Sequence, residues 1–118
     1  DRASGWGAMK VVVPIRLGSP PHLREHWAAR AKRAREHKTA TYYALRAAGA
    51  PHALPCHVTI TRVAPRALDG DNAVAGAKAC RDGVALWLQC DDADPRITWA
   101  YAQRQGGVRE YAAEVEMT

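Results

Sequence analysis

Residues 22–48 contain neither glycine nor proline and are rich in alanine, arginine and lysine. This composition is typical of a helix, which Pro21 can open and Gly49 can close. The apolar positions recur at helical spacing and are Leu23, Trp27, Ala31 and Ala34. The sequence therefore predicts one long helix over 22–48, with the other elements on either side of it.

Four other segments have the alternation or the β-branched content of strands. They are residues 9–17, 56–63, 97–101 and 108–117. Pro14 restricts the first strand to a sheet edge or a bulge. Gly106 and Gly107 together predict a hairpin turn between the last two strands.

A second helix is expected between the second and third strands, from Asp71 or Asn72 to about Leu88. The predicted order is then β-α-β-α-β-β. A chain of 118 residues fits one domain, so we predict an α/β (α+β) fold with helices packed on a mixed sheet over 9–118. Residues 1–8 have no apolar periodicity and are expected to be a disordered leader or a cloning remnant.

The cysteine content favours a reducing compartment. Cys56, Cys80 and Cys90 include no C-x-x-C pair, and their odd number argues against a disulfide framework and against a cysteine zinc site. A cytoplasmic protein is expected. No apolar run approaches the roughly 20 residues that span a bilayer, so no membrane partner is expected.

The charges divide into a basic helix and an acidic segment. The chain has 17 Lys and Arg against 12 Asp and Glu, with a pI near 9.5. The basic residues of the predicted helix are Arg24, Arg30, Lys32, Arg33, Arg35 and Lys38. Residues 69–94 instead hold half of the acidic residues. The helix is a candidate nucleic-acid contact, and a metal-dependent enzyme acting on a polyanion would need both features.

The aspartates have a spacing that suits a metal site. Asp69 and Asp71 point the same way if the backbone between them is extended, and Asp91 and Asp92 follow one helix later. A β-α-β unit can return the chain to the same place or leave it at the far end of the helix. Mg²⁺ takes such oxygen ligands and can activate water for phosphodiester hydrolysis, while Lys78 could stabilise phosphate charge. Ordinary turn and capping roles are the alternative.

A zinc site is a further alternative. His22 and His26 match the H-x-x-E-H pattern of inverted zinc proteases, and histidines four apart on a helix can share a metal. The chain is short for a protease cleft and shows no third ligand. Histidines on a basic helix are more often phosphate contacts or solvated surface.

Three short segments, in order, resemble the RusA family of Holliday-junction resolvases. They are Leu68-Asp69-Gly70-Asp71-Asn72, Lys78-Ala79-Cys80-Arg81-Asp82-Gly83-Val84 and Asp91-Asp92-Ala93-Asp94-Pro95-Arg96-Ile97-Thr98-Trp99. The first strand with its proline and the helix start Arg24-Glu25-His26-Trp27 are similar to phage-type members. The resemblance covers about residues 9–118.

The resemblance implies a homodimeric endonuclease that uses Mg²⁺ or Mn²⁺ and nicks four-way DNA junctions symmetrically, one strand per subunit. By motif position it assigns catalysis to Asp69, Asp71, Asp92 and Lys78. It assigns metal binding to Asp69, Asp71, Asp91 and Asp92. The expected DNA contacts are Arg24, Arg30, Lys32, Arg33, Arg35, Lys38 and Asn72.

The sequence therefore predicts a Mg²⁺-dependent endodeoxyribonuclease of DNA recombination and repair, which resolves Holliday junctions by paired nicks. The alternative is a non-catalytic, structure-specific DNA-binding protein of the same fold. Ala75 favours this alternative, because it occupies the position of the lysine in the best-known form of the family.

Overall fold

A computed structural model describes residues 8–18 and 27–118. Several predictions concern residues outside these ranges. They are the leader up to residue 7, the start of the long helix, Arg24, and the zinc pair His22 and His26.

The sheet has four strands in the order β1-β4-β2-β3. They are β1 (Met9–Val13), β2 (Cys56–Ala64), β3 (Ile97–Gln105) and β4 (Ala112–Met117). β4 pairs antiparallel with both β1 and β2, and β2 pairs parallel with β3. The mixed sheet and the α+β class are therefore confirmed, and β1 lies at an edge as its proline predicts.

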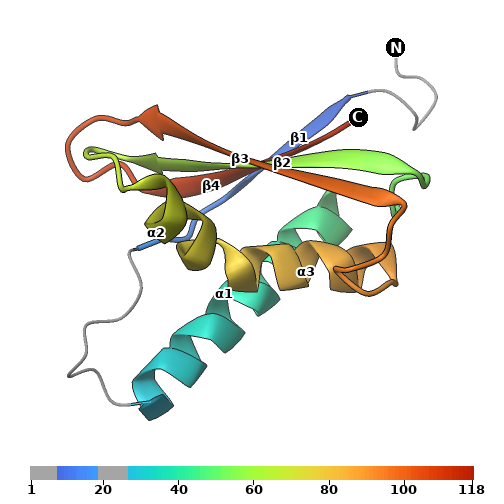
Figure 1. The fold of residues 1–118 in the computed structure, drawn as a ribbon, viewed down its shortest axis with the longest axis horizontal. Helices are drawn as coiled ribbons and strands as arrows, with labels where there is room; N and C mark the ends of the chain where they lie inside the picture. Colours follow the sequence, from blue (N-terminus) through green and yellow to red (C-terminus); the bar gives the residue numbers. More distant parts are fainter. Residues whose placement is uncertain (1–7, 19–26) are drawn as a thin grey trace.

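Three helices lie on one face of this sheet (Figure 1). They are α1 (Trp27–Ala48), α2 (Gly70–Gly76) and α3 (Lys78–Leu88). The single helix expected from Asp71 to Leu88 is wrong in one respect, because it is interrupted at Ala77. A Cβ on Gly76 would collide with the Gly18 carbonyl oxygen, so the segment after β1 crosses the helix backbone at this point.

Three strand boundaries also differ from the prediction. β1 ends at Val13, directly before Pro14, which has no N–H for the ladder. β4 begins at Ala112 rather than at 108, because a turn precedes it: the Glu110 N–H donates to the Gly107 carbonyl, and the Gly107 N–H to the Glu110 carboxylate. β3 in turn extends to Gln105, beside the end of β2. The hairpin predicted at Gly106 and Gly107 is wrong, because β2 lies between β3 and β4 in the sheet.

The core lies between the sheet and the helices. Alternate residues of the strands point into it, and the fully buried ones include Val13, Val58, Ile60, Val115 and Met117. The helices add Leu45 of α1 together with Cys80, Val84 and Trp87 of α3. In the described part of the chain, no helix combines the length and the apolar content needed to cross a bilayer.

Only the second half of α1 belongs to this core. Its buried residues are Thr41 and Leu45, whereas Trp27 is 69% exposed and Ala34 is exposed too. The predicted apolar face at the start of the helix is therefore wrong. Figure 1 shows the reason, since α1 slants away from the sheet and its first turns lie farther from it than its last turns.

α1 and α3 touch backbone to backbone at Gly83. A Cβ there would lie 2.6 Å from the Lys38 carbonyl oxygen and 2.8 Å from the Thr41 Cβ. Thr41 is itself fully buried and donates its hydroxyl to the His37 carbonyl at 2.8 Å. Neither contact can give way without moving α1, so the helix pair requires a residue without a side chain at position 83.

We expect Gly83→Ala to lower the free energy of unfolding by about 1–3 kcal/mol, the usual cost of overpacking. Gly70→Ala is the matched control, because a Cβ at Gly70 meets nothing within 4 Å. Urea denaturation of both variants would measure the difference. Equal stability of the two would show that α1 and α3 can separate at no cost.

Candidate functional site

The first aspartate pair lies at the start of α2. Asp69 is the N-cap residue, yet its side chain makes no capping hydrogen bond, and Asp71 lies in the first turn. Both side chains are exposed. The capping role considered from the sequence therefore does not account for the Asp69 carboxylate.

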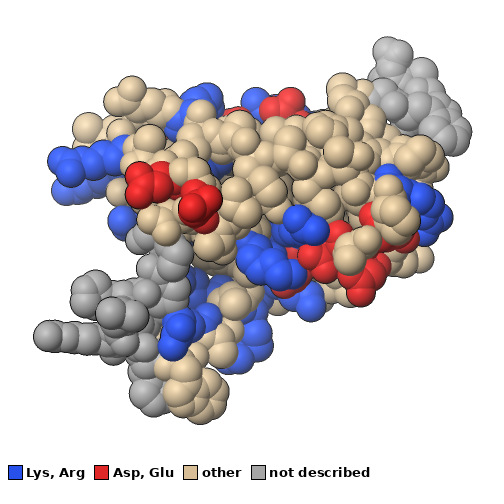
Figure 2. Space-filling model, in the orientation of Figure 1, with Lys and Arg blue, Asp and Glu red and all other residues tan. Residues whose placement is uncertain are grey.

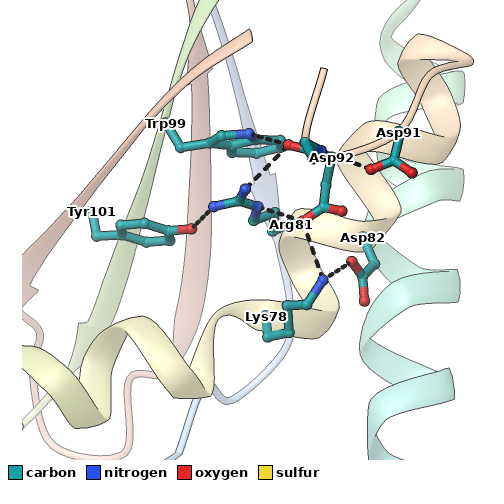
Figure 3. A network of polar contacts seen from close by, with 8 residues as sticks. Lys78, Arg81, Asp82, Asp91, Asp92, Trp99 and Tyr101 are labelled. Carbon is teal, nitrogen blue, oxygen red and sulfur yellow. Dashed lines mark hydrogen bonds and ion pairs between the residues drawn. The ribbon is translucent and has the colours of Figure 1, made fainter. Parts of the chain in front are cut away.

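The second aspartate pair lies in the turn that follows α3 (Figure 3). The Asp91 carboxylate accepts the backbone N–H of Ala93 at 2.8 Å, which is an ordinary turn role. Asp92 instead points back toward α3. Its Oδ2 accepts hydrogen bonds from Lys78 Nζ at 3.2 Å and from Arg81 Nε at 2.8 Å.

Arg81 is the centre of the contacts around Asp92. Besides the Asp92 carboxylate, its guanidinium binds the Asp92 carbonyl at 3.1 Å and the Tyr101 hydroxyl at 2.9 Å. It also lies over the Trp99 ring, 4.5 Å from the ring centroid. Trp99 in turn donates its indole N–H to the Asp92 carbonyl at 2.9 Å. Arg81 thus ties the turn after α3 to both α3 and β3.

Lys78 is shared between two carboxylates. Its Nζ lies 2.6 Å from Asp82 Oδ1, one helical turn away, and 3.2 Å from Asp92 Oδ2. The hydrogen bond to Asp82 is the main reason that the pKa of Lys78 is raised. The hydrogen bond from Lys78 is likewise the main reason that the pKa of Asp92 is lowered, with Arg81 adding to it. Both groups are therefore charged at neutral pH.

A cleft of about 250 Å³ adjoins Lys78. Its lining includes Arg30, Arg33 and His37 of α1, together with Lys78 and Asp82 of α3. Burial, and then the charge of Arg33, lower the pKa of His37, so His37 is neutral at pH 7. Two predicted DNA contacts therefore face the predicted catalytic lysine across one cleft.

The other predicted DNA contacts are dispersed. Lys32 and Arg35 lie exposed on α1, and Asn72 is half-buried on α2. Lys38 lines a second hollow, of about 220 Å³, together with Asp82, Asp91 and Asp92. The basic helix thus borders the acidic turn at this second place as well.

The four carboxylates predicted to hold a metal do not form one group. Among residues 8–18 and 27–118, no three His, Cys, Asp or Glu side chains are placed as a metal-binding cluster. Figure 2 shows acidic side chains at two separate places, over the start of α2 and over the turn beyond α3. As arranged, the pairs 69/71 and 91/92 do not fit a single Mg²⁺ site.

Four residues of the network were not predicted as site residues: Arg81, Asp82, Trp99 and Tyr101. A signal for Asp82 was present, since it follows Lys78 by four residues on a helix. Trp99 and Tyr101 alternate onto the same face of a strand. Nothing in the spacing indicated that Arg81 would reach both.

Comparison of the chain with models of protein families and with curated proteins gave no match. Function is therefore inferred from the residues and their geometry.

We expect Arg81→Met to lower the free energy of unfolding by about 1–3 kcal/mol, because Asp92 and Tyr101 both lose a donor. Arg96→Met is the matched control, since Arg96 is exposed and its one ion pair among the described residues is with Asp94, a surface pair of the kind that adds little to stability. Thermal or urea denaturation measures both. A loss in Arg81→Met no larger than in the control would contradict the central role of Arg81.

The stabilisation through Asp92 should depend on pH. Because the folded-state pKa of Asp92 is lowered, its contribution is present above the unfolded-state value of about 3.9 and is lost as pH falls below it. The difference in unfolding free energy between the wild type and Asp92→Asn should therefore be full at pH 7 and shrink below about pH 4. Urea titrations across this range would test it, and a constant difference would contradict it.

Proposed function

We propose that the protein is an endonuclease that cuts branched DNA, with the four-way junction as its substrate and Mg²⁺ or Mn²⁺ as its cofactor. One observation carries the proposal: Lys78 lies beside Asp92 and lines the cleft that Arg30 and Arg33 share. Lys78 and Asp92 were both expected in the active site from motif position, 14 residues apart.

The cleft has the charge that a DNA backbone needs. Arg30 and Arg33 enter it from α1 and Lys78 from α3, with Asp82 as the opposing carboxylate. Arginine and lysine bind phosphate oxygens through charge-assisted hydrogen bonds. A phosphodiester in this cleft would compete with Asp82 for the Lys78 ammonium, which would then stabilise charge developing on the phosphate.

The metal requirement belongs to the proposal through the chemistry of Asp69 and Asp71. Two exposed carboxylates at the start of α2 offer the oxygen ligands that Mg²⁺ prefers, and Mg²⁺ commonly keeps several waters. The Asp91 carboxylate accepts the Ala93 N–H, and the Asp92 carboxylate binds Arg81. We therefore assign no step of the reaction to the metal.

A second candidate is a structure-specific DNA-binding protein that does not cut. The separation of the two aspartate pairs favours it, because hydrolysis of a phosphodiester by such enzymes needs several carboxylates at one place. The basic cleft would serve binding in either case. Cleavage distinguishes the two candidates, since they share the binding surface.

Symmetric nicking of a junction needs two active sites, so the acting form is a homodimer.

The three cysteines are unpaired, and burial raises the pKa of Cys80 to about 11, so its thiol stays protonated at neutral pH. Unpaired thiols suit the reducing cytoplasm in which we place the protein.

The test is a nicking assay on a synthetic four-way junction and on linear duplex of the same sequence, with Mg²⁺ and with EDTA. We expect paired, symmetric cuts in the junction alone, and none in EDTA. Tight junction binding without cuts at any Mg²⁺ or Mn²⁺ level would favour the non-cutting candidate. Neither binding nor cuts would refute both.

Asp71→Asn should keep junction binding and lose cleavage, because it removes a carboxylate charge that the proposal assigns to the metal. Its matched control is Asp94→Asn, which changes an aspartate outside the proposed site and should leave cleavage unchanged. Gel-shift and nicking measurements on the same preparations separate the two effects. Full cleavage by Asp71→Asn would remove Asp71 from the mechanism.

A further inference from the structure

A second basic pocket lies beside the loop that leads from β2 to α2, and Lys78 is not part of its lining. It has a volume of about 260 Å³, and its lining includes Arg62, Arg66, Gln103 and Arg104. These residues belong to the ends of β2 and β3 and to the loop that leads from β2 to α2. None of them is part of the function proposed above.

Arg62 is the unusual member of this pocket. It is only 8% exposed, yet no carboxylate in the described part of the chain forms an ion pair with it. Its Nε donates to the Leu17 carbonyl and its Nη1 to the Arg66 carbonyl, both at 2.6 Å. Burial, and then the charge of Arg16, lower its pKa. A largely buried positive charge is thus held by carbonyl oxygens and has a cation, not an anion, as its charged neighbour.

The loop beside Arg62 is held in place. Gln103, the register partner of Arg62 on β3, donates its amide to the Leu68 carbonyl at 2.7 Å and accepts the Leu68 N–H at 2.8 Å. With the bond from Arg62 to the Arg66 carbonyl, the loop is fixed at both ends. Such a fixed loop loses little conformational entropy on binding a ligand.

Two guanidinium groups remain for a ligand. Arg62 Nη2 makes no hydrogen bond within the described residues, and Arg66 is exposed and forms no ion pair with a described carboxylate. Arg104 also lines the pocket, but its charge is matched by Glu114 at 2.7 Å. The pocket therefore carries an excess of positive charge, which a planar fork of N–H donors can direct at an anion.

The position of the pocket indicates which kind of anion it binds. Leu68, which Gln103 holds, directly precedes Asp69, so the pocket adjoins the first aspartate pair. Figure 2 shows Lys and Arg side chains at this end of the sheet beside the acidic side chains over the start of α2. A polyanion seated on the arginines would pass over those aspartates.

We propose that Arg62 and Arg66 form a phosphate-binding pocket that takes a backbone phosphate of the DNA and so holds the strand beside Asp69 and Asp71. The proposal rests on the proposed function, and it adds a contact surface before α2, whereas the cleft of Arg30 and Arg33 lies where α2 meets α3. Arg66 supplies the exposed donor. Arg62 supplies the buried one and holds the loop.

The test compares Arg66→Gln with Arg46→Gln. Arg46 is an exposed arginine in the last turn of α1, far along the chain from the pocket, so both variants lose one positive charge. Junction affinity is measured between 50 and 200 mM NaCl, conditions over which phosphate contacts dominate the salt dependence. The slope of log affinity against log salt is negative, and Arg66→Gln should make it less steep by about 0.9, the value for one phosphate contact, whereas Arg46→Gln should not.

A second measurement separates the pocket from the function. Inorganic phosphate is titrated into the ¹⁵N-labelled wild type while the Arg62 Nε–H resonance is followed, a proton fixed on the Leu17 carbonyl. We expect the resonance to shift in the wild type and to shift far less in Arg66→Gln. No shift, together with an unchanged salt slope, overturns the proposal.

The remaining outcomes are also decisive. A phosphate-induced shift with an unchanged slope would make the pocket a site for free phosphate and refute the DNA backbone as its source. Failure of the wild type to bind any junction refutes the proposed function instead. In that case the phosphate titration alone decides whether the pocket binds an anion.

Discussion

The parallel pairing of β2 with β3 determines where the two aspartate pairs lie. Cys56 is opposite Ile97 and Ala64 is opposite Gln105, so the chain leaves β2 at one end of the sheet and enters β3 at the other. A parallel connection needs a crossover, and α2 and α3 supply it. The first aspartate pair begins this crossover and the second pair ends it. Their separation therefore follows from the topology rather than from side-chain rotamers.

Much of the fold could be predicted from local pattern, because period and turn residues act over short distances. The order of the strands is confirmed, and β1 lies at an edge of the sheet as predicted, although Pro14 comes just after the strand. The second helix is divided in two, and the last two strands do not form the predicted hairpin. The break between α2 and α3 could not be predicted, because Ala77 is a good helix former. The break lies beside the approach of Gly18 to Gly76, a contact between residues nearly sixty positions apart.

The candidate site could be predicted only in part, for a related reason. Motif order named Lys78 and Asp92, and the structure brings them together. Motif order gave no signal that Arg81 would bind the Asp92 carboxylate, the Asp92 carbonyl and Tyr101 at once. Arg62 is a similar case, since a charged residue within a buried strand shows no pattern of its own. Each arginine donates a hydrogen bond to a backbone carbonyl of a connecting segment, Arg62 to the loop after β2 and Arg81 to the turn after α3. This role depends on proximity in the folded chain.

The slant of α1 affects how the protein opens locally. The second half of the helix is buried against the sheet and α3, while its first turns lie farther from the sheet. Resistance of backbone amides to hydrogen exchange follows such burial, so protection along α1 should decline from Leu45 toward Trp27. Arg30 and Arg33 lie on the less protected half. A polyanion bound there would slow hydrogen exchange of the backbone amides in those turns. Exchange at the start of α1 would therefore show whether the polyanion is bound.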